Sequence, residues 1–211
     1  MMIKLIYEDK NLVVCIKPTG VPSQSDGKED MVKLLSEQCG VKIYPVHRLD
    51  TAVGGVMVFA KNKVTAADLN VQILNGEFVK RYLAVTDGVP VEKQGIYEDL
   101  LFKDSHKNKS YVVKRERKGV KKASLEYEVI AEADGKALVE VRLFTGRTHQ
   151  IRVQFASRKT PLTGDGKYGS RDNSCNIALW SHSVEFNLNG EKKRFECEPD
   201  CVFPWNLFTK K

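Results

Sequence analysis

The sequence predicts an α+β fold whose core is a mixed, mostly antiparallel β-sheet with flanking helices and loops. Short runs of β-branched and aromatic residues recur along the chain, and turn-forming Gly, Asn and Asp residues separate them. Only three stretches carry apolar residues at helical spacing. No internal repeat and no low-complexity linker divides the 211 residues, so we expect a single domain over residues 1–211.

The first half of the chain predicts a hairpin, a helix, a strand, a second helix and a further strand. These elements fall at residues 3–18, 30–40, 53–60, 64–76 and 78–85. Asp30 is suited to cap the first helix, and Gly40 and Gly76 are suited to end the two helices. The apolar positions that we expect to face the core are Met31, Leu34 and Leu35 in the first helix and Val64, Ala67, Val71 and Leu74 in the second.

The second half predicts strands, one helix and an exposed arm. Residues 103–122 have the composition of an exposed loop or hairpin arm, although Tyr111 to Val113 could pair as a strand. Strands are predicted at 124–130 and 137–144 around a turn at Asp134 and Gly135, and a last pair at 177–188 and 193–197 around Asn189 and Gly190. A helix should begin near Thr148 and bury Ile151 and Phe155, and residues 162–169 should form a loop.

The charge distribution indicates a polyanionic partner. The net charge is +7 and the isoelectric point is near 9.1. Residues 103–122 hold nine Lys and Arg against Asp104 and Glu116, a local +7 that equals the whole surplus. Such a surplus favours a partner such as nucleic acid, although a modestly basic surface is also common in proteins that bind nothing charged.

The chain shows no signal for a membrane or for an oxidising compartment. Residues 1–11 lack the apolar core of a signal peptide, and no apolar run reaches the roughly 20 residues of a membrane span. The five cysteines are scattered and form no C-x-x-C pair, so we expect reduced thiols in a cytoplasmic protein. A zinc site through Cys197, Cys201 and a histidine is the weak alternative; we expect no metal.

The first segment with candidate catalytic residues is His47-Arg48-Leu49-Asp50, which precedes the apolar run at 53–60. A carboxylate beside a cation and just before a buried strand can be held ionised and aimed, as a nucleophile or general base requires. The alternative is an ordinary surface salt bridge of Asp50 with a nearby arginine.

Two further segments carry polar groups near predicted element ends. Gly146-Arg147-Thr148-His149-Gln150-Ile151-Arg152 lies between a strand and a helix, where backbone N–H groups and arginines suit a phosphate or a carboxylate. The alternative is a helix start with solvent-facing arginines. In the strand that begins at Phe78, alternation places Tyr82 on one face, where it could equally be core packing.

Together these segments resemble the RluA family of pseudouridine synthases. The resemblance covers most of the chain and rests on five blocks in the family's order: EDKNLVVCIKPTGVPSQS, PVHRLDTAVGGVMVFAKN, FVKRYLAVTDG, LVEVRLFTGRTHQIRVQFASRKTPLTGDGKYG and IALWSHSVEF. The H-R-L-D and G-R-T-H-Q-I-R blocks are the most specific.

The resemblance implies a pseudouridine synthase fold around a central active-site cleft, and a role for individual residues. Asp50 would start cleavage of the uridine N-glycosidic bond, Arg147 would be its ion-pair partner, and Tyr82 would stack on the base. The residues expected to bind substrate are His47, Arg48, His149, Arg152 and Leu179. The reaction would need no cofactor, the substrate would be ribosomal or transfer RNA with the base flipped out, and we expect a monomer.

The chain departs from the family pattern at three points. The family usually has Thr-Ser-Gly where this sequence has Val53, Gly54 and Gly55, and histidine is common where Trp180 stands. We also expect no S4 RNA-binding domain, because the catalytic pattern begins almost at Met1. Two alternatives remain: an RNA-binding module that has lost catalysis, and a glycosidase-like enzyme using Asp50, which would normally need a second carboxylate.

Overall fold

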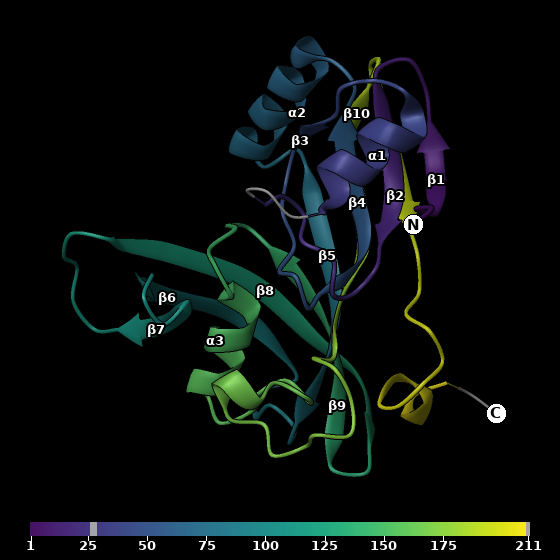
Figure 1. Ribbon diagram of the computed structural model, residues 1–211. Helices are drawn as coiled ribbons and strands as arrows, with labels where there is room; N and C mark the ends of the chain where they lie inside the picture. Colours follow the sequence, from purple (N-terminus) through teal and green to yellow (C-terminus); the bar gives the residue numbers. More distant parts are fainter. Residues whose placement is uncertain (26–28, 210–211) are drawn as a thin grey trace. The chain divides into compact units, whose positions relative to one another are not determined.

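The computed structural model describes residues 1–25 and 29–209, and the chain divides into two compact units. Unit 1 comprises Met1–Arg81 and Trp180–Pro199, and unit 2 comprises Tyr82–Leu179 and Asp200–Lys211. Two of the three boundaries fall inside strand β5 (Val79–Asp87) and at the start of strand β10 (Leu179–Leu188), so the chain passes between the units along regular strands at these points (Figure 1). The third boundary, between Pro199 and Asp200, follows the last strand.

Unit 1 is built on a mixed sheet in the order β1-β2-β4-β10. Its strands are β1 (Leu5–Glu8), β2 (Leu12–Lys17), β4 (Gly54–Ala60) and β10, with β3 (Tyr44–Pro45) paired to β4 and β11 (Glu191–Glu196) paired to β10. All of these pairings are antiparallel except β4 with β10. The predicted hairpin at 3–18, the strand near 53–60 and the last strand pair are therefore confirmed.

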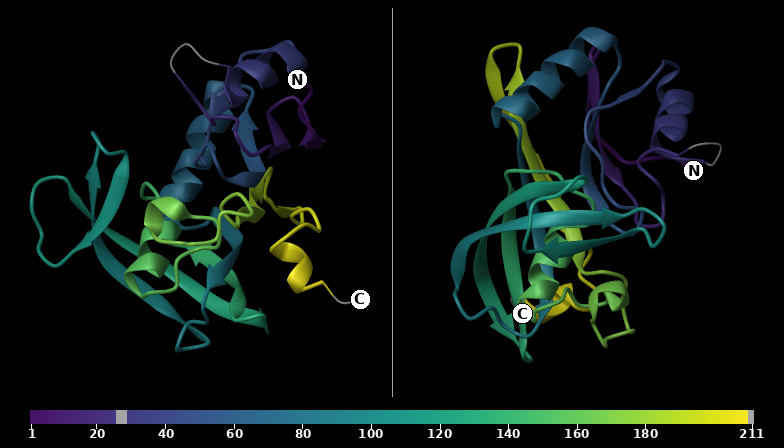
Figure 2. Two further views of the ribbon diagram at one scale, coloured as in Figure 1. Left: turned by 60° about the horizontal axis from the view of Figure 1, so that its bottom comes forward. Right: turned by 90° about the vertical axis from the view of Figure 1, so that its left-hand side faces the viewer.

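Strand β4 is the centre of unit 1 and is buried along its whole length. Val56 and Val58 point to the face that packs on helix α2 (Lys63–Asn75), together with Phe186 of β10. Met57 and Phe59 alternate onto the opposite face and are equally buried. Helix α1 (Met31–Cys39) and α2 lie on opposite sides of these strands, so β4 is covered from both sides (Figure 2, right).

The predicted ends of both helices in unit 1 are confirmed by their caps. The Asp30 carboxylate accepts the N–H of Lys33 at the start of α1, and Gly40 ends it at a φ of 67°. Asn62 caps α2 in the same way, and Gly76 ends it at a φ of 75°. Left-handed φ values of this kind suit glycine because it lacks a Cβ.

The predicted buried face of α2 is wrong. Val64, Val71 and Leu74 are 81%, 53% and 84% exposed, whereas Leu69 and the polar Gln72 are buried. Gln72 can be buried because its side chain donates to the Asn187 carbonyl at 2.9 Å and accepts the Asn187 N–H at 2.8 Å. Apolar periodicity could not reveal this, because it assigns glutamine to the solvent side.

The strands of unit 2 follow in the order β5-β9-β8-β6-β7. Its strands besides β5 are β6 (Gln94–Asp104), β7 (Lys109–Val113), β8 (Val120–Ala133) and β9 (Lys136–Leu143), and its helices are α3 (Gln150–Ser157) and the short 3-10 turns η1 (Gly166–Tyr168) and η2 (Trp205–Leu207). Strand pairing at 111–113, the turn at Asp134–Gly135 and the helix after Thr148 are as predicted. Strand β6 is not predicted by the sequence, because its residues are mostly half-exposed and include Glu98 and Asp99.

Helix α3 covers one face of the unit 2 sheet (Figure 1). Ile151 and Phe155 are buried, as predicted, and the Phe155 ring contacts Tyr97 and Tyr127 edge-on. Val153 packs on Leu101 of β6. On the opposite face of β6 and β7, Ile96 is 59% exposed and Tyr111 is 36% exposed. Across residues 1–25 and 29–209, no helix has the length and apolar content needed to cross a membrane.

Candidate active site

The His47–Asp50 segment is held in unit 1 by hydrogen bonds at two of its residues. The Ser23 hydroxyl donates to the Leu49 carbonyl at 2.8 Å and accepts its N–H at 3.0 Å. The His47 ring accepts the Val58 N–H at 3.1 Å, which ties the segment to β4. Leu49 and His47 are both buried, whereas Arg48 is exposed. The segment is therefore anchored at His47 and Leu49, and Arg48, which lies between them, is at the surface.

The His47 ring is a buried neutral group. It is 8% exposed, and burial lowers its pKa to about 3, with a smaller contribution from the nearby Lys80 charge. A neutral ring that accepts through Nε2 carries its proton on Nδ1, which has no hydrogen-bond partner among the described residues. The ring also packs on Phe78 at 5.6 Å between centroids.

The turn that follows Asp50 is fixed by a buried lysine. Lys17 is fully buried, and its ammonium donates to the carbonyls of Pro18 at 2.9 Å, Thr51 at 3.2 Å and Val53 at 2.7 Å. The Val53 N–H closes the turn on the Asp50 carbonyl at 3.0 Å. Burial lowers the pKa of Lys17 to about 8, and the charge of Asp50 opposes that decrease. The half-buried Asp50 carboxylate thus lies within electrostatic range of a buried cation in its own unit.

The two unusual positions of the sequence, Gly54 and Trp180, contact each other. They are partners in the parallel pairing of β4 with β10. A Cβ on Gly54 would lie 2.5 Å from the Trp180 ring, closer than any real Cβ contact. The indole N–H of Trp180 donates to the Cys197 carbonyl at 2.7 Å, which holds the ring in place. Glycine at 54 therefore leaves the space that the Trp180 ring occupies.

Gln150 fixes the Arg147 loop in unit 2. The Gln150 side chain accepts the Thr145 hydroxyl at 2.7 Å and the Arg147 N–H at 3.0 Å, and it donates to the Ser124 carbonyl at 3.1 Å. The Arg147 Nε donates to the Lys122 carbonyl at 2.9 Å. Arg147 is half-buried, and hydrogen bonds from its backbone N–H and from its side chain both hold it in place.

The two remaining polar residues of this block are packed inside unit 2. Arg152 is 5% exposed and forms a two-point ion pair with Asp165, at 2.6 Å from Nε and 2.9 Å from Nη2. The His149 Nδ1 lies 3.0 Å from the Tyr168 hydroxyl, which also accepts the Ser110 N–H. His149 has a φ of 53°, so the chain enters α3 through a left-handed residue without a side-chain cap. This geometry couples α3, η1 and β7.

The expected site residues fall into two groups. His47, Arg48 and Asp50 belong to unit 1, whereas Tyr82, Arg147, His149, Arg152 and Leu179 belong to unit 2. Tyr82 and Leu179 are 5% and 6% exposed. Within unit 2, the structure brings Arg147, His149 and Arg152 together at the start of α3.

Sequence reasoning missed the residues that hold these groups: Lys17, Ser23, Gln150 and Asp165. A signal existed for two of them, because Lys17 ends an otherwise apolar strand and Gln150 lies inside the most specific block. Ser23 and Asp165 make their bonds to residues 26 and 13 positions away, which no local pattern indicates. Over the described residues 1–25 and 29–209, no group of three His, Cys, Asp or Glu side chains is placed to bind a metal.

Comparison with solved structures defines the class of protein. The fold matches that of the human RNA pseudouridylate synthase domain containing 4 protein with a TM-score of 0.79 at 25% identity, over 93% of this chain and 89% of that one. The expected fold class is therefore confirmed. A fold of this class is that of a pseudouridine synthase.

The sequence comparisons define the family. The profile of the RNA pseudouridylate synthase family matches residues 11–157. An uncharacterised RNA pseudouridine synthase of Zymomonas mobilis is 34% identical over 92% of both chains. The ribosomal large subunit pseudouridine synthase D of Borreliella burgdorferi is 33% identical, and the match covers 92% of this chain but 63% of the relative. The chain belongs to the RluA-type RNA pseudouridine synthase family.

Proposed function

We propose that this protein converts uridine in a structured RNA to pseudouridine, with Asp50 as the catalytic carboxylate. The observation that carries the proposal is the family membership together with the fixation of the Asp50 turn by Lys17 and Ser23 in its own unit. A carboxylate on a turn that several hydrogen bonds hold in place suits a reaction at a single carbon atom.

The proposed chemistry is an isomerisation that conserves every atom of the nucleotide. The C1′–N1 bond breaks, the uracil turns within the site, C1′ bonds to C5, and the proton of C5 leaves while N1 gains one. Asp50 starts the cleavage, Arg147 pairs with the carboxylate and keeps it ionised, and Tyr82 stacks on the uracil so that it turns without leaving. The base must first leave the RNA stack, at a cost of a few kcal/mol.

We assign the five expected substrate-binding residues according to their surroundings. Arg48 is exposed beside Asp50 and is suited to contact RNA, and Leu179 is suited to an apolar pocket wall. His47 and Arg152 are buried and bonded within their own units, so we propose that they support the catalytic loops instead of contacting RNA. His149 has the same supporting role through Tyr168.

The catalytic proposal is tested by pseudouridine mapping of cellular RNA from a strain that lacks the gene. The strain is complemented with the wild type, Asp50→Asn, Arg147→Ala or Asp134→Asn. We expect the wild type and the Asp134→Asn control to restore the modification, because Asp134 lies in an exposed turn at a φ of 50° where asparagine is equally suited. Asp50→Asn and Arg147→Ala should not restore it.

The same variants distinguish the enzyme from an RNA-binding module. Asp50→Asn should bind the substrate RNA with an affinity close to that of the wild type, because an amide nitrogen of similar size replaces one carboxylate oxygen. If the wild-type strain and the deletion strain contain the same pseudouridines, the protein is not an active synthase, and the RNA-binding module is the hypothesis that remains. Modification restored by Asp50→Asn would remove Asp50 from the mechanism.

We further propose ribosomal or transfer RNA as the substrate, with large-subunit ribosomal RNA as the first to test, since relatives carry that name. We propose a monomer that acts in the cytoplasm. The five scattered cysteines and the basic surplus support an intracellular RNA partner. Mapping both RNA classes in one experiment identifies the substrate, and sedimentation of the purified chain measures its oligomeric state.

A further inference from the structure

The open face of the unit 2 sheet carries a groove over strand β6. The groove has a volume of about 620 Å³ and lies between β7 and β8. Its walls include Leu100 and Val113 as apolar groups, Lys114 and Lys122 as cations, and Ser124 as a hydroxyl. Two acidic residues, Glu98 and Asp99, also line the groove, and the Asp99 carboxylate accepts from Gln154 and Arg158 of the α3 region. All of them belong to unit 2, and helix α3 occupies the opposite face of this sheet.

An apolar and aromatic platform continues from the groove along the same face. Strand register places Phe102 opposite Tyr111 on β7 and opposite Val120 on β8. Residues directly opposite each other in antiparallel strands share one face, so these three side chains form a row beside the row of Val113, Leu100 and Lys122. Tyr111 is 36% exposed, which leaves part of its ring open to solvent.

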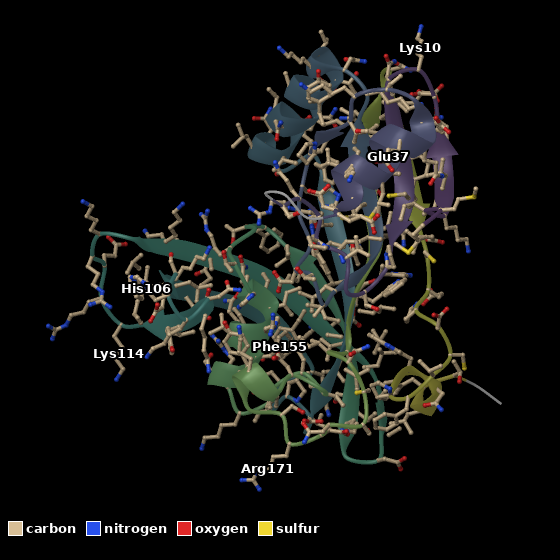
Figure 3. All side chains as sticks on the ribbon, viewed as in Figure 1. Lys10, Glu37, His106, Lys114, Phe155 and Arg171 are labelled. Carbon is tan, nitrogen blue, oxygen red and sulfur yellow. The ribbon has the colours of Figure 1, made fainter. Side chains whose placement is uncertain are left out.

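Cations border part of this platform. The Arg117 guanidinium lies 4.7 Å from the centre of the Phe102 ring, and the Lys109 ammonium lies 5.8 Å from that of Tyr111. Lys114 projects outward from the arm, residues 103–122, which carries a charge equal to the whole positive surplus of the chain (Figure 3). Lys122 pairs with Glu116 at 3.7 Å, but this ion pair is exposed and therefore weak.

The groove adjoins the proposed catalytic arginine. Lys122 lines the groove, and its carbonyl accepts the Arg147 Nε at 2.9 Å. Thr145, on the same loop as Arg147, also lines the groove. A strand of RNA that occupies the groove therefore passes close to Arg147 within one unit.

We infer that this groove and platform bind unpaired nucleotides of the substrate RNA that flank the target uridine. Bases stack on Tyr111 and on the apolar floor at Leu100, and phosphates pair with Lys114 and Lys122. Single-stranded RNA fits because it offers flat apolar bases and one negative charge per nucleotide, which match a platform bordered by cations. The inference rests on the proposed function, since it names where the same substrate is held.

Binding to a fluorescein-labelled oligouridine of about 12 nucleotides tests the inference. Fluorescence anisotropy at several salt concentrations gives Kd and its salt slope, in the otherwise intact Asp50→Asn chain. The groove variant is Lys114→Gln with Lys122→Gln, and the control is Lys10→Gln with Lys33→Gln, which removes the same charge from exposed positions of unit 1. We expect only the groove variant to flatten the salt slope, by about 1.4, because each phosphate that a lysine neutralises adds about 0.7 to the slope.

The stacking part of the inference has its own variant. Tyr111→Ala should raise Kd by about 10-fold with an unchanged salt slope, and Tyr111→Phe should keep most of the affinity. Equal effects of the groove and control variants would overturn the inference, because only diffuse charge would then attract RNA. Full affinity in Tyr111→Ala would overturn the stacking contact, and full affinity in all variants would overturn the groove as an RNA site. Binding is read without turnover, so none of these outcomes depends on isomerase activity.

Discussion

At the scale of single residues, the polar groups of the two specific blocks mostly act as supports. Of the H-R-L-D block, His47 accepts from β4 and Leu49 is held by Ser23, which leaves Arg48 and Asp50 as the more accessible side chains. Of the G-R-T-H-Q-I-R block, Gln150 and Arg152 are bonded inside unit 2 around Arg147. In each block, few side chains are therefore accessible, and the bonded residues fix the position of these accessible side chains.

The buried histidine makes the folded state sensitive to acid. The pKa of His47 is lowered from 6.5 to about 3 by burial, so between these pH values the unfolded chain binds a proton here and the folded chain does not. The free energy of unfolding should therefore decrease as the pH falls from 6.5 toward 3, by about 1.4 kcal/mol per pH unit from this group. His47→Gln keeps an acceptor for Val58 and removes the titration. Urea unfolding of both proteins across this range should show a flatter pH dependence in the variant, and parallel curves would contradict the assignment.

Lys17 should act as a positioning residue for Asp50. Lys17→Met leaves three carbonyl groups around the Asp50 turn without their donor, so the turn should relax. We expect kcat to fall by about 100-fold, as a shift of about 1 Å in a catalytic group can cause. KM and RNA affinity should change little, because Lys17 is fully buried and offers nothing to RNA. A change in KM alone would give Lys17 a different role.

At the scale of elements, the pairing of β4 with β10 explains why two departures from the family pattern occur together. Gly54→Ser places a Cβ against the Trp180 ring and should lower the free energy of unfolding by about 1–3 kcal/mol through overpacking. Adding Trp180→His, the residue common in the family, removes the clash. The double variant should therefore lose less unfolding free energy than the two single variants lose together. We expect a difference of about 1 kcal/mol or more in a double-mutant cycle. Additive effects would mean that the two positions are independent.

The elements show how far sequence reasoning reaches in this chain. The ends of α1 and α2 could be predicted, because Asp30, Gly40 and Gly76 act through local backbone chemistry. The buried face of α2 could not, because Gln72 is stabilised there by bonds to a strand 115 residues away. Strand β6 escapes prediction for a related reason: Asp99 accepts from Gln154 and Arg158 of the α3 region, so a charged residue lies on a packed face.

In the candidate site, too, the features set by local sequence could be predicted and those set by distant contacts could not. The blocks that contain Asp50 and Arg147 could be found from the sequence, because their residue order is unusual in itself. The supports Ser23 and Asp165 could not, since each bonds to a residue that is distant in sequence. The spacing of apolar residues along the sequence indicates which side chains are buried in the core. It does not indicate which polar side chains form hydrogen bonds with each other after folding, and the candidate site depends on those bonds.

At the scale of the whole molecule, each unit has its own core, yet the chain connects them through regular strands. Residues Val79–Arg81 of β5 belong to unit 1, and the next residues of the same strand belong to unit 2. The chain returns to unit 1 at Trp180, one residue into β10. Unfolding of either unit would disrupt part of a strand that the other unit uses. We therefore expect the two units to unfold together.

The two tryptophans of the chain test this expectation, because Trp180 belongs to unit 1 and Trp205 to unit 2. The single-tryptophan variants Trp180→Phe and Trp205→Phe each report one unit by fluorescence, and circular dichroism of the same samples reports the backbone of both. Urea midpoints from fluorescence and from circular dichroism should coincide within each variant, as in a two-state transition. A fluorescence midpoint clearly below that of circular dichroism in one variant would show that the unit it reports unfolds first. In that case the strand continuity through β5 and β10 would not be sufficient to couple the two cores.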